Sequence, residues 1–136
     1  MDFGRCESQT CDPRIVVSER QSKLTLDNPD RKSVRRVRVD GCLPSDGPRC
    51  DYLLIPAAGF EIFVELKGSD IAHAVLQLEA SILAFGVKTG LVRRESFIVS
   101  TRSPKHSPEI QRLQSRFRKS LSSGLTIRER QHVVPI

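Results

Sequence analysis

The stretch that decides the fold is residues 60–67, which reads FEIFVELK. Its side chains separate by parity, so that the apolar residues at 60, 62, 64 and 66 share one face of an extended chain. This period of two, in a run rich in Phe, Ile and Val, predicts a buried β-strand. Glu65 and Lys67 lie two residues apart near its end, and we expect both to point to the other face.

Two more strands are predicted before this one. Residues 50–55 form a mostly apolar run that starts after a Gly/Pro turn and predicts a strand buried on both faces. Residues 34–39 alternate valine with arginine and predict a strand with Arg36 and Arg38 on one face. Further upstream, Leu24 and Leu26 alternate with polar neighbours, which predicts another strand.

Two helices are predicted after residue 67. Ser69 is the expected N-cap of a helix over residues 70–88, and the apolar residues 71, 75, 78, 82 and 85 recur at helical spacing. Other apolar side chains, at 72, 74, 76 and 83, suggest that this helix is covered on several sides. A basic helix follows Pro108, and short strands are expected at residues 97–99, 125–127 and 133–134.

These elements predict an α/β (α+β) fold with a mixed central β-sheet flanked by helices. The 136 residues are enough for a single domain with one core. We divide it into an irregular or partly helical lead-in, residues 1–22, a core, residues 23–101, and a C-terminal part, residues 102–136, with the basic helix and the terminal strands.

Charge and composition narrow the class of partner and the compartment. The net charge of +6 favours a polyanion such as nucleic acid, although a solvated basic surface is the ordinary alternative. No run approaches the roughly 18 apolar residues of a membrane span, and the start lacks the pattern of a signal peptide. We therefore expect no membrane association and a cytoplasmic location. The cysteines at 6, 11, 42 and 50 are accordingly expected as reduced thiols.

The candidate chemistry lies on the strands over 50–55 and 60–67. Asp51 heads the first, and Glu65 lies near the end of the second. Neighbouring strands lie about 5 Å apart, so both carboxylates can share a hard cation such as Mg²⁺ or Mn²⁺. Such an ion activates water and neutralises phosphoryl charge, and Lys67 can stabilise developing negative charge. The alternative is an ordinary cross-strand ion pair between Glu65 and Lys67.

Asp51, followed fourteen residues later by Glu65-Leu66-Lys67, resembles the PD-(D/E)xK superfamily of restriction-endonuclease-like nucleases. The resemblance covers roughly residues 34–100. It implies a restriction-endonuclease-like core, metal binding by Asp51, Glu65 and the Leu66 carbonyl, and catalysis by Lys67. It also implies a polar residue from the next helix, for which Gln77 is the candidate. Cys50 stands where the family has its nominal proline.

The resemblance further implies an acidic residue on an N-terminal helix, and Glu19 is the only candidate found for it. The cysteine spacing does not favour a zinc site, because the gaps are not those of two close pairs. Asp40 is expected in a turn, and His73 shares a polar helical stripe with Gln77.

The resulting hypothesis is a Mg²⁺-dependent endonuclease that hydrolyses nucleic-acid phosphodiester bonds, with DNA favoured over RNA. The alternative is a module of the same fold that binds nucleic acid or protein without turnover. The small size is compatible with a homodimer or with binding to a larger partner. Besides His73, the candidate nucleic-acid contacts are basic residues: Arg36, Arg38, Arg49, Arg93, Arg94, Arg112, Arg116, Arg118 and Lys119.

Overall fold

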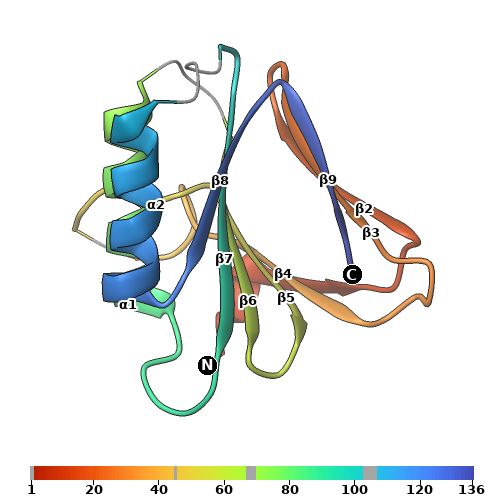
Figure 1. The fold of residues 1–136 in the computed structure, drawn as a ribbon. Coiled ribbons are helices and arrows are strands. Elements are labelled where there is room, and N and C mark those ends of the chain that lie inside the picture. Colours follow the sequence, from red (N-terminus) through yellow and green to blue (C-terminus); the bar gives the residue numbers. More distant parts are fainter. Residues whose placement is uncertain (1, 45, 67–69, 103–106) are drawn as a thin grey trace.

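The computed structural model describes residues 2–44, 46–66, 70–102 and 107–136, which form three layers. Two helices make the first layer, a six-stranded mixed sheet the second and a three-stranded sheet the third (Figure 1). The fold is therefore α+β with a mixed central sheet, as the strand and helix patterns predicted. The third layer was not foreseen.

The larger sheet has the strand order β1-β4-β5-β6-β7-β8. Its strands are β1 (Glu7–Thr10), β4 (Val34–Arg38), β5 (Tyr52–Ala57), β6 (Phe60–Leu66), β7 (Arg93–Ser100) and β8 (Gly124–Glu129). Neighbours from β1 to β6 are antiparallel, whereas β6, β7 and β8 are parallel to one another. Because of these directions, the start of β5 and the ends of β4, β6, β7 and β8 lie at one edge of the sheet, which we call the carboxyl edge.

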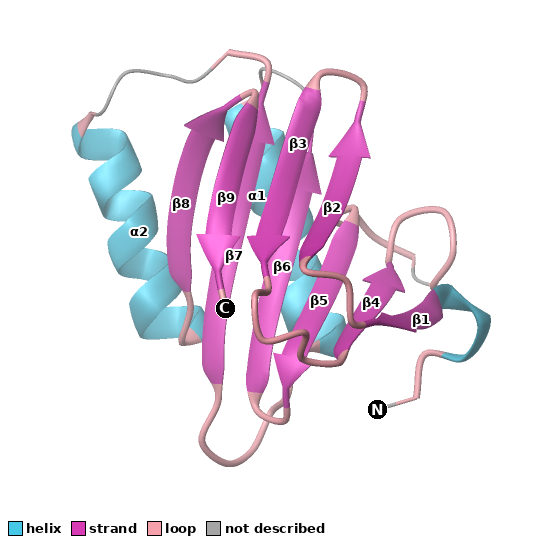
Figure 2. Ribbon diagram, turned by 90° about the vertical axis from the view of Figure 1, so that its right-hand side faces the viewer, coloured by secondary structure: helices cyan, strands magenta, loops and turns pink. Residues whose placement is uncertain are grey.

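The smaller sheet corrects the prediction for the N-terminal segment. Residues 1–22 were expected to be irregular or partly helical, yet the described part holds a 3₁₀ turn, η1 (Gly4–Cys6), then β1 and β2 (Arg14–Glu19). Ile15 and Val17 are buried and alternate with exposed residues. This alternating run is too short to stand out in the sequence. Figure 2 shows β2 beside β3 (Ser22–Asp27), with β9 (Gln131–Pro135) on the other side of β3.

The helices are α1 (Ile71–Phe85) and α2 (Pro108–Leu121). Asp70 caps α1 by accepting a hydrogen bond from the His73 N–H, whereas the predicted cap, Ser69, lies outside the described residues. The predicted cover on several sides of α1 is wrong, since Leu76 and Leu83 are 54% and 63% exposed. Neither described helix is long and apolar enough to cross a membrane.

Each face of the larger sheet packs a hydrophobic core of its own. Between the sheet and the helices lie Phe63 of β6, Leu78 of α1 and Phe117 of α2, among other side chains. Between the two sheets lie Leu24 of β3 and Val64 of β6 with their neighbours. The parity predicted for the stretch 60–67 is thus confirmed for β6, because Phe63 and Val64 contribute to opposite cores.

The cysteines depart from the expectation of four reduced thiols. Cys6 and Cys42 form a disulfide that ties η1 to the turn after β4. Cys11 and Cys50 are free, the first exposed and the second buried. The loop between the bonded pair holds β1 to β4, so only the folded arrangement of these strands brings the two sulfurs together.

Candidate functional site

Three acidic side chains meet at the carboxyl edge. Asp51 immediately precedes β5, and Glu65 is the next-to-last residue of β6. The β5–β6 register pairs Tyr52 with Val64, and the Asp51 N–H donates a 3.0 Å hydrogen bond to the Val64 carbonyl, so Asp51 lies beside the end of β6 that carries Glu65. Glu19, the last residue of β2, reaches Asp51 from the other sheet, because its carboxyl group hydrogen bonds to that of Asp51.

Asp51 is held in a defined orientation and is almost fully buried. Its side chain is the acceptor of a 2.7 Å hydrogen bond from the Leu66 N–H to Oδ2. Burial raises the pKa of the Asp51 carboxyl from 3.8 to about 6, and the hydrogen bond and charge of Glu19 act in the same direction. The Leu66 N–H and the Glu65 carboxyl oppose this rise. The pKa therefore lies close to the range in which enzymes use carboxyl groups.

The three carboxyl groups form a row with Asp51 in the middle. The carboxyl groups of Glu65 and Glu19 both act on the pKa of the Asp51 carboxyl, so the three acids lie close together with Asp51 between the other two. Glu65 is only 1% exposed, so its negative charge is costly without compensation. A cation beside these acids would offset the cost of burying their negative charge, which is the electrostatic condition that favours a hard metal ion.

Helix α1 fixes the backbone that leads into Asp51. The Gln77 side-chain amide donates a 3.1 Å hydrogen bond to the Arg49 carbonyl, and Ser81 Oγ accepts one of 2.8 Å from the Cys50 N–H. Gln77 therefore acts on the site through the backbone before Asp51. Burial raises the pKa of the Cys50 thiol to about 12, which rules out a thiolate at that position near neutral pH.

A polar cavity of about 260 Å³ opens beside the acidic row. It is lined by Ser18, Glu19, Arg38, Asp40, Asp51 and Tyr52. Arg38 and Tyr52 end β4 and begin β5, so the cavity lies where the two sheets meet at the carboxyl edge. Asp40 lies in a turn, as predicted, and it also contributes to this wall.

The residues suit a hard cation through oxygen donors. The carboxylates of Asp51 and Glu65 and the Leu66 carbonyl are the ligands that the resemblance implies, and Mg²⁺ commonly uses one or two carboxylates with waters. Among the described residues, no group of three His, Cys, Asp or Glu side chains is arranged to hold a metal ion. The fit therefore rests on two carboxylates. Lys67 lies outside the described residues.

The basic residues singled out in the sequence lie in different places. Arg38 lines the cavity, and Arg36 lies over the Tyr52 ring at 5.3 Å. The Arg49 guanidinium hydrogen bonds to the Leu43 carbonyl and lies 3.5 Å from the Gly47 carbonyl, which holds it within its own loop.

The residues predicted on the helices are not brought to the cavity. Arg112 and Arg116 pair on the helix layer with Glu109 and Glu79 respectively. His73, on the first turn of α1, is exposed and does not line the cavity.

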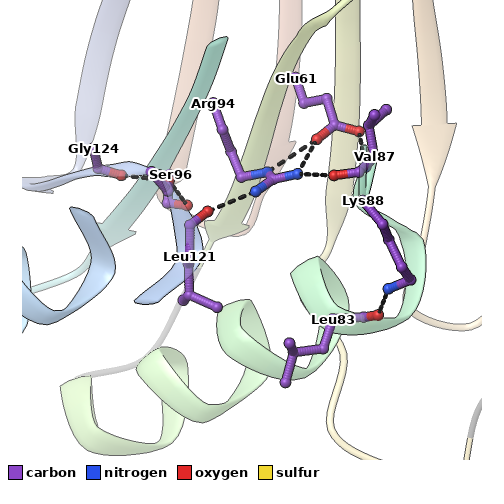
Figure 3. A network of polar contacts seen from close by, with 9 residues as sticks. Glu61, Leu83, Val87, Lys88, Arg94, Ser96, Leu121 and Gly124 are labelled. Carbon is purple, nitrogen blue, oxygen red and sulfur yellow. Dashed lines mark hydrogen bonds and ion pairs between the residues drawn. The ribbon is translucent and has the colours of Figure 1, made fainter. Parts of the chain in front are cut away.

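Arg94 has a structural role instead of a place on a phosphate-binding surface. It is buried and forms an ion pair of 2.9 Å with Glu61. As Figure 3 shows, its guanidinium also donates hydrogen bonds to the Val87 and Leu121 carbonyls, which follow α1 and end α2. The neighbouring Arg93 is exposed and lies 4.2 Å from the centre of the Phe60 ring.

Sequence reasoning found Glu19 only as a weak candidate, and it expected the acidic residue on a helix. The useful signal was the spacing of Ile15, Val17 and Glu19, which places the carboxylate on the inward face of β2. Ser81 and Tyr52 carried no signal, because their contacts come from elements distant in the sequence.

Comparison of the chain with models of protein families, with curated proteins and with solved structures finds no match.

Proposed function

We propose that this chain is a divalent-metal-dependent endonuclease that hydrolyses nucleic-acid phosphodiester bonds, with DNA as the favoured substrate. The observation that carries the proposal is that Glu19 and Glu65 both act on the buried Asp51 carboxyl, and that Asp51 and Glu19 line one polar cavity. An Asp heading one strand, a Glu near the end of the next and a helix thereafter also agree with the restriction-endonuclease-like core that the resemblance implies.

In this proposal Asp51, Glu65 and the Leu66 carbonyl hold Mg²⁺ or Mn²⁺, which supplies charge neutralisation at the phosphoryl group. The hydrogen bond from the Leu66 N–H keeps one Asp51 oxygen in place and leaves the other for the ligand. Hydrolysis adds water to phosphorus and breaks a P–O ester bond. Lys67 contributes by orienting the water or by stabilising negative charge, as the resemblance implies.

Arg38 complements the acidic row on the cavity wall. Its guanidinium presents several N–H donors, which suit the non-bridging oxygens of a phosphodiester. Without a cation, a phosphate near Asp51 and Glu65 would be repelled by the negative charge of these two carboxylates. We therefore assign Arg38 to substrate binding, with the carboxylates facing the metal.

The test is cleavage of plasmid DNA and RNA with Mg²⁺, Mn²⁺ or EDTA. Asp51→Asn, Glu65→Gln and Lys67→Ala should each lower the rate by more than about a hundredfold. Glu79→Gln is the control, because Glu79 forms only a surface pair with Arg116 on the helix layer. Equal rates in all five proteins would remove the assignment.

A binding module without turnover is the second candidate. It is favoured by the finding that no three acidic, histidine or cysteine side chains of the described segments are arranged around a metal position. Calorimetry separates the two functions. The endonuclease should bind Mn²⁺ in a manner that Asp51→Asn abolishes, whereas a module should bind oligonucleotides with no dependence on that residue.

A further inference from the structure

A group of basic residues lies at the same end of the two sheets as the acidic row and was not singled out in the sequence. We call it the basic rim. Its five members are Arg20, Lys23, Arg102, Arg128 and Arg130, all exposed. The described segments 20–23, 100–102 and 128–131 carry these five cations and a single acidic residue, Glu129.

Backbone hydrogen bonds bring the basic rim together. The Lys23 N–H donates to the Arg130 carbonyl over 2.8 Å, and the Arg130 N–H donates to the Ser100 carbonyl over 2.7 Å. Arg130, in the turn between β8 and β9, thus links the start of β3 to the end of β7. Arg102 follows Ser100 by two residues, and Arg20 occupies the β2–β3 turn. Both turns and the end of β7 lie at the upper end of the sheets in Figure 1.

The basic rim is at the same end as the candidate site. Glu19 hydrogen bonds to Asp51 and is followed directly by Arg20. β6, which carries Glu65, ends beside β7, and β7 ends at Ser100. The cations therefore flank the acidic row from the β2–β3 turn to the end of β8.

The side chains of the rim are available to a ligand. No described acidic side chain forms an ion pair with any of the five, and the Arg128 guanidinium makes its hydrogen bond to the carbonyl of the preceding residue. Arg20 and Arg130 have φ values of 53° and 64°, a region that favours Gly and Asn.

We infer that the basic rim binds the phosphodiester backbone of nucleic acid and leads it to the acidic row. This inference rests on the proposed function and assigns a substrate-binding surface to it. Cations at several neighbouring positions match a ligand with evenly spaced negative charges. A membrane surface carries negative charge too. The proposed metal ligands Asp51 and Glu65 lie at the same end of the molecule as the rim, which favours nucleic acid, because its phosphodiesters are the bonds that such a site would hydrolyse.

The experiment measures binding of labelled single-stranded and duplex oligonucleotides by fluorescence anisotropy in EDTA, across a salt series. The rim variant is Arg20→Asn/Arg130→Asn, since Asn tolerates the positive φ. The control is Arg14→Gln/Arg31→Asn, which removes the same charge at the opposite end of the smaller sheet, where Arg31 also has a positive φ, of 50°.

The rim variant should bind at least about tenfold more weakly, and its slope of log affinity against log salt should fall by about 1–2, because each lost phosphate contact contributes about 0.7–0.9. The control should stay near the parent. Equal weakening in both variants, or none, would overturn the inference. So would rim-dependent binding to vesicles with anionic lipid that exceeds binding to oligonucleotides.

Binding in EDTA does not depend on cleavage. Rim-dependent binding without cleavage by any metal-loaded protein would refute only the proposed function. Cleavage that the rim variant leaves unchanged, with unchanged binding, would refute only the rim.

Discussion

At Asp51, burial and the Glu19 carboxyl favour the protonated form, and the pKa of about 6 lies above the ordinary value of 3.8. The folded state therefore binds more protons than the unfolded state between these values. Protonated Asp51 therefore adds to the free energy of unfolding. This contribution is complete below about pH 4 and is lost as the pH rises through 6.

In EDTA, we expect the melting temperature of the parent to fall relative to Asp51→Asn between pH 4 and 7. Asn keeps an oxygen for the Leu66 N–H, so the hydrogen bond of 2.7 Å is retained while the titration is removed. Thermal melts at several pH values measure this difference. Two parallel melting curves would contradict the raised pKa.

Among the elements, β6 and β7 are joined to the ends of both helices by one buried cation. Arg94 pairs with Glu61 at 2.9 Å and donates to the Val87 and Leu121 carbonyls. Glu61 Oε2 in turn accepts a hydrogen bond from the Val87 N–H. This network holds the helix layer on the sheet, and α1 in turn holds the backbone before Asp51.

Arg94→Met should lower the free energy of unfolding by about 3–5 kcal/mol, since it leaves Glu61 buried without its partner. Urea denaturation measures the change. Arg93→Met is the matched control, because Arg93 is exposed and only lies over the Phe60 ring. We expect it to cost less than about 1 kcal/mol. A similar loss in both variants would contradict a special role for Arg94.

For the whole molecule, the Cys6–Cys42 disulfide connects the N-terminal turn to the larger sheet across 36 positions of sequence. A crosslink over such a loop typically stabilises a protein by about 2–4 kcal/mol, mainly by restricting the unfolded chain. Disulfides are also more usual in oxidising compartments than in the cytosol, so this bond does not support the cytoplasmic location expected from the sequence.

Reduction, or the variant Cys6→Ser/Cys42→Ser, should therefore lower the free energy of unfolding by about 2–4 kcal/mol in urea melts. In the native oxidised protein, a thiol reagent should modify Cys11 quickly. Cys50 should react only on unfolding, because it is buried and its pKa is about 12. Rapid reaction of four thiols, or an unchanged melt on reduction, would contradict the disulfide.

The local pattern of the chain predicted most of the elements. Period-two alternation identified β4 and β6, and helical spacing identified α1 and α2. An element that buries one face needs apolar residues at a regular spacing, and this spacing is visible in a short stretch of sequence. The closeness of Asp51 to the end of β6 also followed from sequence, since two adjacent strands joined by a tight turn must be neighbours.

The sequence by itself thus indicated most strands of the larger sheet, though not β1, both helices, and the two carboxylates just before β5 and near the end of β6. Only the tertiary structure decided that β2, β3 and β9 form a third layer, which brings Glu19 to Asp51 and Arg20, Lys23 and Arg130 to the same end of the molecule. The physical reason is that β9 pairs with β3 although more than a hundred residues separate them in the sequence. The residues of either strand alone do not indicate which distant strand will pair with it.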